Sequence, residues 1–136
     1  MVTSRSLSIP MPTVALRGLV VFPGMNINFD VGREKSIAAL KTAMSHNQEL
    51  FLVTQKDIRE NDPDYDELYK VGTIARVSHM LRIPNSENIR VSVEGLRRAR
   101  LCEVLSNDEY LICEIKPKND TPIKAEDHDY AAALVR

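Results

Sequence analysis

The stretch that decides the fold runs from residue 71 to residue 101 and reads VGTIARVSHMLRIPNSENIRVSVEGLRRARL. Apolar and polar residues alternate on both sides of the polar segment Pro84–Asn88. Alternation with a period of two is typical of a strand with one buried face, and a short polar segment between two such runs predicts a hairpin. The alternation puts one set of side chains on the buried face of the first strand: Val71, Ala75, Val77, Leu81 and Ile83.

The β pattern continues beyond this hairpin. Gly95 interrupts the returning strand and indicates a bulge or a sharp bend, because glycine inside a strand often marks one. Residues 96–105 and 110–115 then predict a further strand pair around the loop Ser106–Glu109, and Pro117 ends the β region.

The first half of the chain adds shorter elements. Alternation predicts strands at residues 12–18 and 25–29, joined by an apolar segment whose Pro23-Gly24 pair is turn chemistry. A helix is expected from Gly32 to about Asn47, with apolar residues at spacings of three and four. The apolar run Leu50–Val53 is short enough to be a buried strand.

These elements predict a mainly β fold with α structure: a small closed or nearly closed β-barrel with one packed helix and a C-terminal helix leading out. Residues 1–11 are expected to be a flexible leader, residues 12–117 the domain, and residues 118–136 a linker and the start of a helical region. The last helix has no terminating residue before Arg136, so we expect the natural protein to continue.

Composition narrows the function classes. The chain has 136 residues and a net charge of -1, with 43% hydrophobic and 27% charged residues. These values exclude disorder as the main state and argue against a simple nucleic-acid clamp. No apolar run approaches the roughly 20 residues of a membrane span, and no signal core is present, which predicts a cytoplasmic protein with no membrane partner. Cys102 and Cys113 are expected to be reduced thiols.

The sequence contains no catalytic motif, and we expect no catalytic, cofactor-binding or metal-binding residue in it. Lys35-Ser36 ends a segment like a phosphate-binding loop, but the two glycines at the required spacing are missing, so we interpret it as the start of a helix. The acidic segment around residues 57–67 is expected to be a solvated loop with a single turn at residues 66–69.

Arg97, Arg98 and Arg100 form a basic patch that leaves an RNA-binding reading open. Such barrels bind RNA with aromatic side chains to stack on, and no aromatic residue interleaves with these arginines in the sequence. We therefore expect the arginines to face solvent and pair with the acids of 57–67 or with a partner domain, and nucleic acid to be an unlikely partner.

The apolar loop between the first two strands is the stronger candidate site. Its residues cannot all point inward around a turn, and exposed apolar surface usually marks an interaction site. Met80 is predicted on the polar face of its strand, where methionine suits varied partners. The candidate binding residues of this interaction site are Leu19, Val20, Phe22, Pro23, Met25 and Met80.

Four segments together resemble the amino-terminal region of the Lon family of ATP-dependent proteases. They are Leu16–Met25, Val31–Ile37, Leu68–Ala75 and Val91–Ala99. Their order and spacing match from about residue 12 to about residue 116.

The resemblance implies a PUA-like β-barrel that recognises unfolded or damaged proteins for degradation. It implies a hexamer in which ATP, Mg and a Ser-Lys protease act in domains absent from this chain, so the fragment itself is expected to be no enzyme. Its partners would be those substrates and the rest of its own chain. Two alternatives stay open: a free-standing PUA-like ligand- or RNA-binding barrel, and a purely structural role in the ring.

Overall fold

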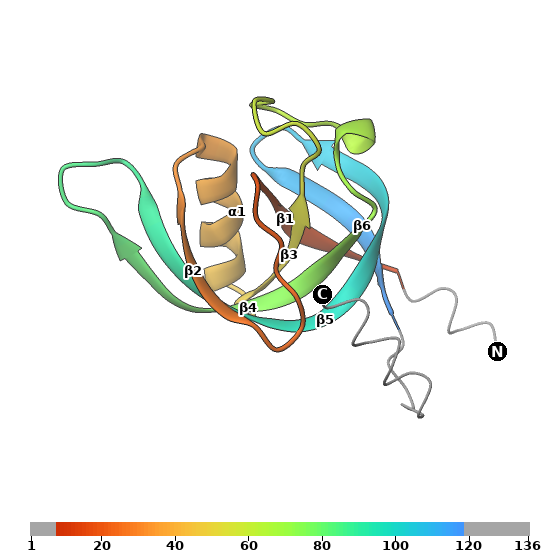
Figure 1. Cartoon of the computed structure of the whole chain (residues 1–136), viewed down its shortest axis with the longest axis horizontal. Coiled ribbons are helices and arrows are strands. Elements are labelled where there is room, and N and C mark those ends of the chain that lie inside the picture. Colours follow the sequence, from red (N-terminus) through yellow and green to blue (C-terminus); the bar gives the residue numbers. More distant parts are fainter. Residues whose placement is uncertain (1–7, 119–136) are drawn as a thin grey trace.

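The computed structural model describes residues 8–118 (Figure 1). Within them lie six strands, one α-helix and one 3-10 turn. Their bounds are β1 Ile9–Leu16, β2 Asn26–Val31, α1 Glu34–Met44, β3 Glu49–Thr54, η2 Tyr65–Glu67, β4 Val71–Arg82, β5 Ile89–Asn107 and β6 Leu111–Pro117. The predicted mainly β fold with one helix is confirmed.

The strands form one sheet that closes on itself. The order is β2-β5-β4-β3-β1-β6, and β6 also pairs with β5, so five strands make a ring and β2 extends it along β5. The pairing of β1 with β3 is parallel, whereas the other pairings are antiparallel. Parallel neighbours need a crossover connection, which β2 and α1 supply. Figure 1 shows α1 lying against the outside of this ring, beside β2 and β1.

The sheet has a core on each of its faces. Leu50 and Leu52 of β3 belong to the outer cluster, with Leu40 of α1. Phe51 and Val53 of the same strand belong to the cluster inside the ring. Because both faces of β3 are buried, its sequence is continuously apolar rather than alternating, which is typical of strands covered on both sides.

Two β-bulges change the expected faces of the long hairpin. The register of β4 and β5 shifts between Val77 and His79, so one residue is skipped and the alternation changes phase. Met80 is therefore opposite buried Val91 and packs against the outer core, while Leu81 is 55% exposed. The prediction of Met80 on the polar face and Leu81 on the buried face was wrong for this reason.

The second bulge lies at Leu96, opposite the step from Ile74 to Ala75. The predicted irregularity near Gly95 is confirmed, but it does not end the strand, because β5 continues from Ile89 to Asn107.

At the N-terminal end of the domain, β1 begins at Ile9. Residues 9–11 are therefore part of a strand and not of a leader. The helix predicted at the C-terminus lies outside the described residues.

Both cysteines are free. Cys113 lies inside the ring, where burial raises its pKa to about 11, against a weaker opposing contribution from a hydrogen bond with Thr13. Cys102 is exposed. The folded chain therefore holds one accessible and one protected thiol.

We expect Ellman's reagent at pH 8 to modify one thiol rapidly, and a Cys102→Ser variant to react only as fast as it unfolds, because the thiolate is the reactive form. A raised pKa in the folded state also means that stability falls as pH rises from about 9, where the unfolded thiol ionises, to about 11. Rapid labelling of the Cys102→Ser variant would contradict the burial of Cys113.

Candidate functional site

The apolar loop, residues 17–25, joins β1 to β2 and ends in a tight turn. The N–H of Met25 donates to the carbonyl of Phe22 at 3.0 Å, with Pro23 and Gly24 at the centre. Gly24 has φ +88°, which glycine adopts without strain. The turn predicted from the Pro23-Gly24 pair is confirmed.

Side chains from β3 and β4 fix the backbone of this loop. The hydroxyl of Thr54 donates to the carbonyl of Leu19 at 2.8 Å, and the buried hydroxyl of Thr73 donates to the carbonyl of Val21 at 2.6 Å. Each bond satisfies a carbonyl that the loop could not pair within itself. The loop is thus a tethered part of the outer face.

The turn also docks against β5 at Gly95. The N–H of Gly24 donates to the Gly95 carbonyl at 2.9 Å, and the N–H of Gly95 donates to the Met25 carbonyl at 2.8 Å. A Cβ at position 95 would lie 2.3 Å from the carbonyl oxygen of Phe22. Only glycine allows the two backbones to approach this closely, so Gly95 sets the position of the apolar loop.

The loop residues divide between core and surface. Val21 is buried at 4% exposure, and Leu19 and Met25 pack against the outer core. Val20 is 49% exposed, Pro23 is exposed and Phe22 is half-buried. Of the predicted loop residues, the structure therefore leaves Val20, Phe22 and Pro23 accessible from outside.

Two further residues extend this surface: Tyr69, which the sequence reasoning did not select, and Val71, whose predicted place on the buried face was wrong. Tyr69 is 51% exposed and Val71 is 38% exposed. Residues 69, 71 and 73 are each two positions apart, so their side chains lie on the same, outer side of the extended chain. The N–H of Tyr69 donates to the carbonyl of Thr54, whose hydroxyl holds Leu19. We call Val20, Phe22, Pro23, Tyr69 and Val71 the outer-face patch.

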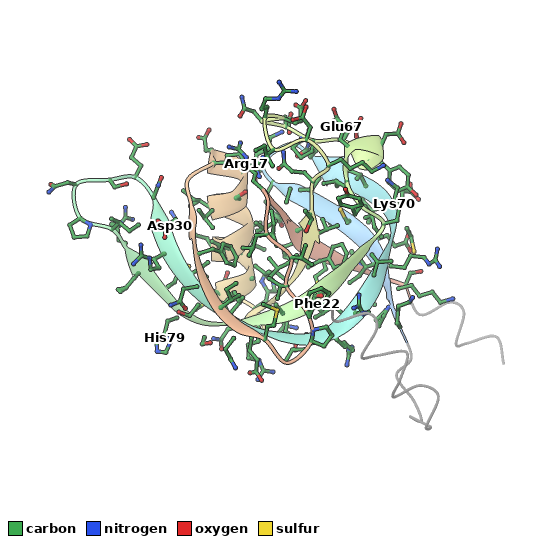
Figure 2. The ribbon with its side chains drawn as sticks, viewed as in Figure 1. Arg17, Phe22, Asp30, Glu67, Lys70 and His79 are labelled. Carbon is green, nitrogen blue, oxygen red and sulfur yellow. The ribbon has the colours of Figure 1, made fainter. Side chains whose placement is uncertain are left out.

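The basic segment of β5 meets the patch at one point. The guanidinium carbon of Arg98 lies 5.4 Å from the centre of the Phe22 ring, within the range of a cation–π contact. Figure 2 shows Phe22 at the lower edge of the ring, beside β4 and β5. No aromatic residue interleaves with these arginines in the sequence, but Phe22 and Arg98, 76 positions apart, come together in the tertiary structure.

Of the two predicted partners of these arginines, the acids of 57–67 are not found paired with them among the described residues, and a partner domain stays a prediction. The ion pairs among residues 8–118 are Lys35–Asp62, Arg59–Asp57, Arg76–Glu49 and Arg90–Asp30. Asp62 instead meets the start of α1 and the end of β5. Hydrogen bonds from Asn107 and then from Lys35 hold its pKa below the ordinary range.

Met80 lies apart from the outer-face patch. It is opposite Val91 on β5, whereas the loop meets β5 at Gly95, four positions further along. At about 3.3 Å per residue, this separates the two points by about 13 Å. The structure thus joins three of the predicted residues in one surface and places Met80, which is half-buried, in the hairpin.

Two other kinds of feature are absent from the described part of the chain. Nowhere in residues 8–118 do three His, Cys, Asp or Glu side chains gather as metal ligands would. No described helix has both the length and the apolar character needed to cross a membrane.

Comparison with known proteins identifies the family. The model of the ATP-dependent protease La (LON) substrate-binding domain matches residues 10–136. The chain is 42% identical over 124 residues to the Lon protease of Brevibacillus choshinensis, covering 91% of this chain and 16% of that protein. It is 43% identical over 106 residues to Lon protease 1 of Bacillus subtilis, covering 78% of this chain and 14% of that protein. The chain therefore spans about a sixth of the length of the curated relatives that it matches.

Solved structures show the same fold. The N-terminal domain of a Mycobacterium avium complex Lon protease superposes with a TM-score of 0.68 at 20% identity, covering 93% of this chain and 66% of that one. The Lon N-terminal domain protein of Xanthomonas campestris gives 0.62 at 17% identity, covering 94% and 72%. With its sequence and its fold both matching, the chain belongs to the Lon protease family, as the amino-terminal substrate-binding domain.

Proposed function

We propose that the chain binds unfolded or damaged proteins through the outer-face patch and passes them to ATPase and protease domains of a longer protein. The observation that carries the proposal is a tethered loop that holds apolar side chains in solvent, in a domain of a substrate-binding family. Folded proteins hide their apolar segments, so a surface of this kind selects unfolded ones without a fixed sequence code.

The remaining features of the family belong to the same proposal. The full-length protein is a cytoplasmic hexamer that uses ATP and Mg, with a Ser-Lys protease, and the present chain contributes no catalytic residue. Six copies of a weak patch on one ring raise the avidity for a long client through effective concentration. The isolated chain is expected to show neither ATPase nor peptidase activity.

The binding surface is tested by replacing Val20 with serine. The Val20 side chain is exposed in the free chain and would be buried against the client, which contributes about 1 kcal/mol to the free energy of binding. We therefore expect the Kd for a carboxymethylated, permanently unfolded protein to rise about fivefold. Fluorescence anisotropy of the labelled client measures it.

Leu105→Ser is the matched control, because Leu105 is 47% exposed against 49% for Val20 and lies outside the patch. Its Kd is expected to stay that of the parent chain. Equal weakening by both substitutions would show nonspecific apolar binding and remove the patch from the proposal.

The RNA-binding alternative has one observation in its favour, the contact of Arg98 with Phe22. RNA binding through Arg97, Arg98 and Arg100 would weaken steeply with salt, because each phosphate contact releases counterions. We expect the chain to bind the unfolded protein and not a single-stranded RNA at 150 mM salt (about physiological ionic strength). Salt-sensitive RNA binding that is lost when the three arginines become alanine would favour the alternative.

A further inference from the structure

Strand β4 loses its neighbour on one side after Val77. Its register with β3 ends where Glu49 meets Arg76. The N–H of Val77 still donates to the carbonyl of Gln48 at 2.8 Å, and the side-chain amide of Gln48 donates back to the Val77 carbonyl at 3.0 Å. Beyond this point, residues 78–82 pair with β5 alone among the described strands. We call residues 78–82 the open β4 edge.

The hairpin geometry leaves this edge accessible. Figure 1 shows the tip of the β4–β5 hairpin projecting away from the ring, with β4 on the side away from β2. His79, labelled in Figure 2, points outward from the body of the domain. No described strand covers this side of β4.

The register shows which backbone groups face the open side. The N–H of Ile83 donates to the carbonyl of Asn88 at 3.2 Å, so these two residues form a hydrogen-bonded pair. Such pairs alternate along an antiparallel ladder, which leaves the N–H and carbonyl of Met80 and Arg82 directed away from β5. The pairs that bond within the hairpin are then Ile83–Asn88, Leu81–Arg90 and His79–Ser92.

The other side of β5 gives the same alternation independently. The N–H of Gly95 donates to Met25, so the odd-numbered residues of β5 direct their backbone groups to β2. The even-numbered residues 88, 90 and 92 are thereby left for β4. Two separate hydrogen bonds thus agree that Met80 and Arg82 offer unpaired donors and acceptors at strand spacing.

The side chains of this edge suit a bound polypeptide. Leu81 is 55% exposed, and His79 and Arg82 are exposed beside it. Arg82 belongs to none of the ion pairs found among residues 8–118. The open β4 edge therefore carries uncompensated positive charge next to an apolar side chain.

We propose that the open β4 edge takes up an extended, acid-containing segment of an unfolded protein as an added β-strand. The inference rests on the proposed function and supplies a binding mode for it. Only a free polypeptide backbone offers the matching row of donors and acceptors, and pairing with a sheet edge reads extension rather than sequence. Arg82 favours a segment with Asp or Glu over one with Lys, by charge complementarity.

The direct test is amide hydrogen exchange by NMR with a defined peptide. The probe is an eight-residue peptide of alternating valine and threonine with a glutamate at each end. At a concentration about ten times its Kd, the amides of Met80 and Arg82 are expected to exchange about tenfold more slowly. The outward amide of Asn28, on the free edge of β2, is the internal control and is expected to keep its rate. The same peptide with lysine at each end is expected to bind more weakly.

A proline substitution tests the same edge. Arg82→Pro removes one outward N–H without breaking a bond to β5, and proline is tolerated in edge strands in that orientation. Losing one hydrogen bond of about 1 kcal/mol is expected to raise the peptide Kd about fivefold. Arg82→Gln removes the charge but keeps the N–H, so it separates these two contributions. Asn28→Pro makes the equivalent change at the β2 edge and is expected to leave the Kd unchanged.

The outcomes separate the two proposals. Peptide binding without slower exchange at Met80 and Arg82, or with a Kd unchanged by Arg82→Pro, overturns strand addition and leaves the outer-face patch as the binding site. Absence of binding by both the peptide and the unfolded protein overturns the proposed function as well.

Discussion

Replacing Gly95 with alanine is expected to lower the free energy of unfolding by about 3 kcal/mol, the cost of forcing extra atoms into a closely packed site. The new Cβ would lie 2.3 Å from the carbonyl oxygen of Phe22, 3.0 Å from its carbonyl carbon and 3.3 Å from the Cα of Pro23. All three are backbone atoms, so no rotamer change relieves the contact. Urea unfolding followed by circular dichroism measures the loss.

The same substitution is expected to weaken client binding, because the turn at Pro23 must move away from β5. Gly32→Ala is the matched control. Its Cβ would meet only the side chain of Asn88, with the nearest atom at 2.4 Å, and that side chain can rotate away. We expect a cost below about 1 kcal/mol and unchanged binding. Equal costs at the two glycines would contradict the role given to the Phe22–Gly95 contact.

Phe51→Ala is expected to cost about 4 kcal/mol, the largest single effect in the domain, because it removes a whole ring from a packed core. Phe51 has no exposed surface and is among the largest fully buried side chains. Its ring lies inside the barrel against Gly72, where a Cβ would come within 2.7 Å of the ring. The interior cannot collapse onto this space without moving β4.

Two companions calibrate that loss. Phe51→Leu keeps most of the volume and is expected to cost about 1.5 kcal/mol. Ile58→Ala removes a side chain that is 57% exposed and is expected to change stability by less than about 0.5 kcal/mol. Urea midpoints of the three variants measure the series, and a Phe51→Ala cost no greater than that of Ile58→Ala would contradict the interior packing.

Local patterns in the sequence predicted most of the elements. The alternation of β4 and β5, the apolar run of β3 and the periodicity of α1 each reflect which side of a single element is buried. Such patterns are local, so they are readable without a partner. Strand β1 was predicted to begin three residues too late, because Pro10 and Pro12 interrupt its alternation although Ile9 and Met11 pair with β6.

The candidate site was predicted only in part. The turn at Pro23-Gly24 and its neighbours Val20 and Phe22 were recognised, since a turn cannot bury every apolar residue around it. Tyr69 was missed and Val71 was wrongly predicted to be buried, because their exposure depends on where β4 meets the apolar loop. The one signal available in the sequence was a tyrosine directly before a strand of alternating residues.

By itself, the sequence determined a β-rich domain with one helix, a tight turn at Pro23-Gly24 and the family to which the chain belongs. The tertiary structure decided the rest. A single skipped residue between Val77 and His79 exchanges the faces of Met80 and Leu81, and Arg98 reaches Phe22 only through closure of the sheet. A bulge is set by the register between two strands, and a contact between distant residues is set by their packing, so neither is encoded in the periodicity of one segment.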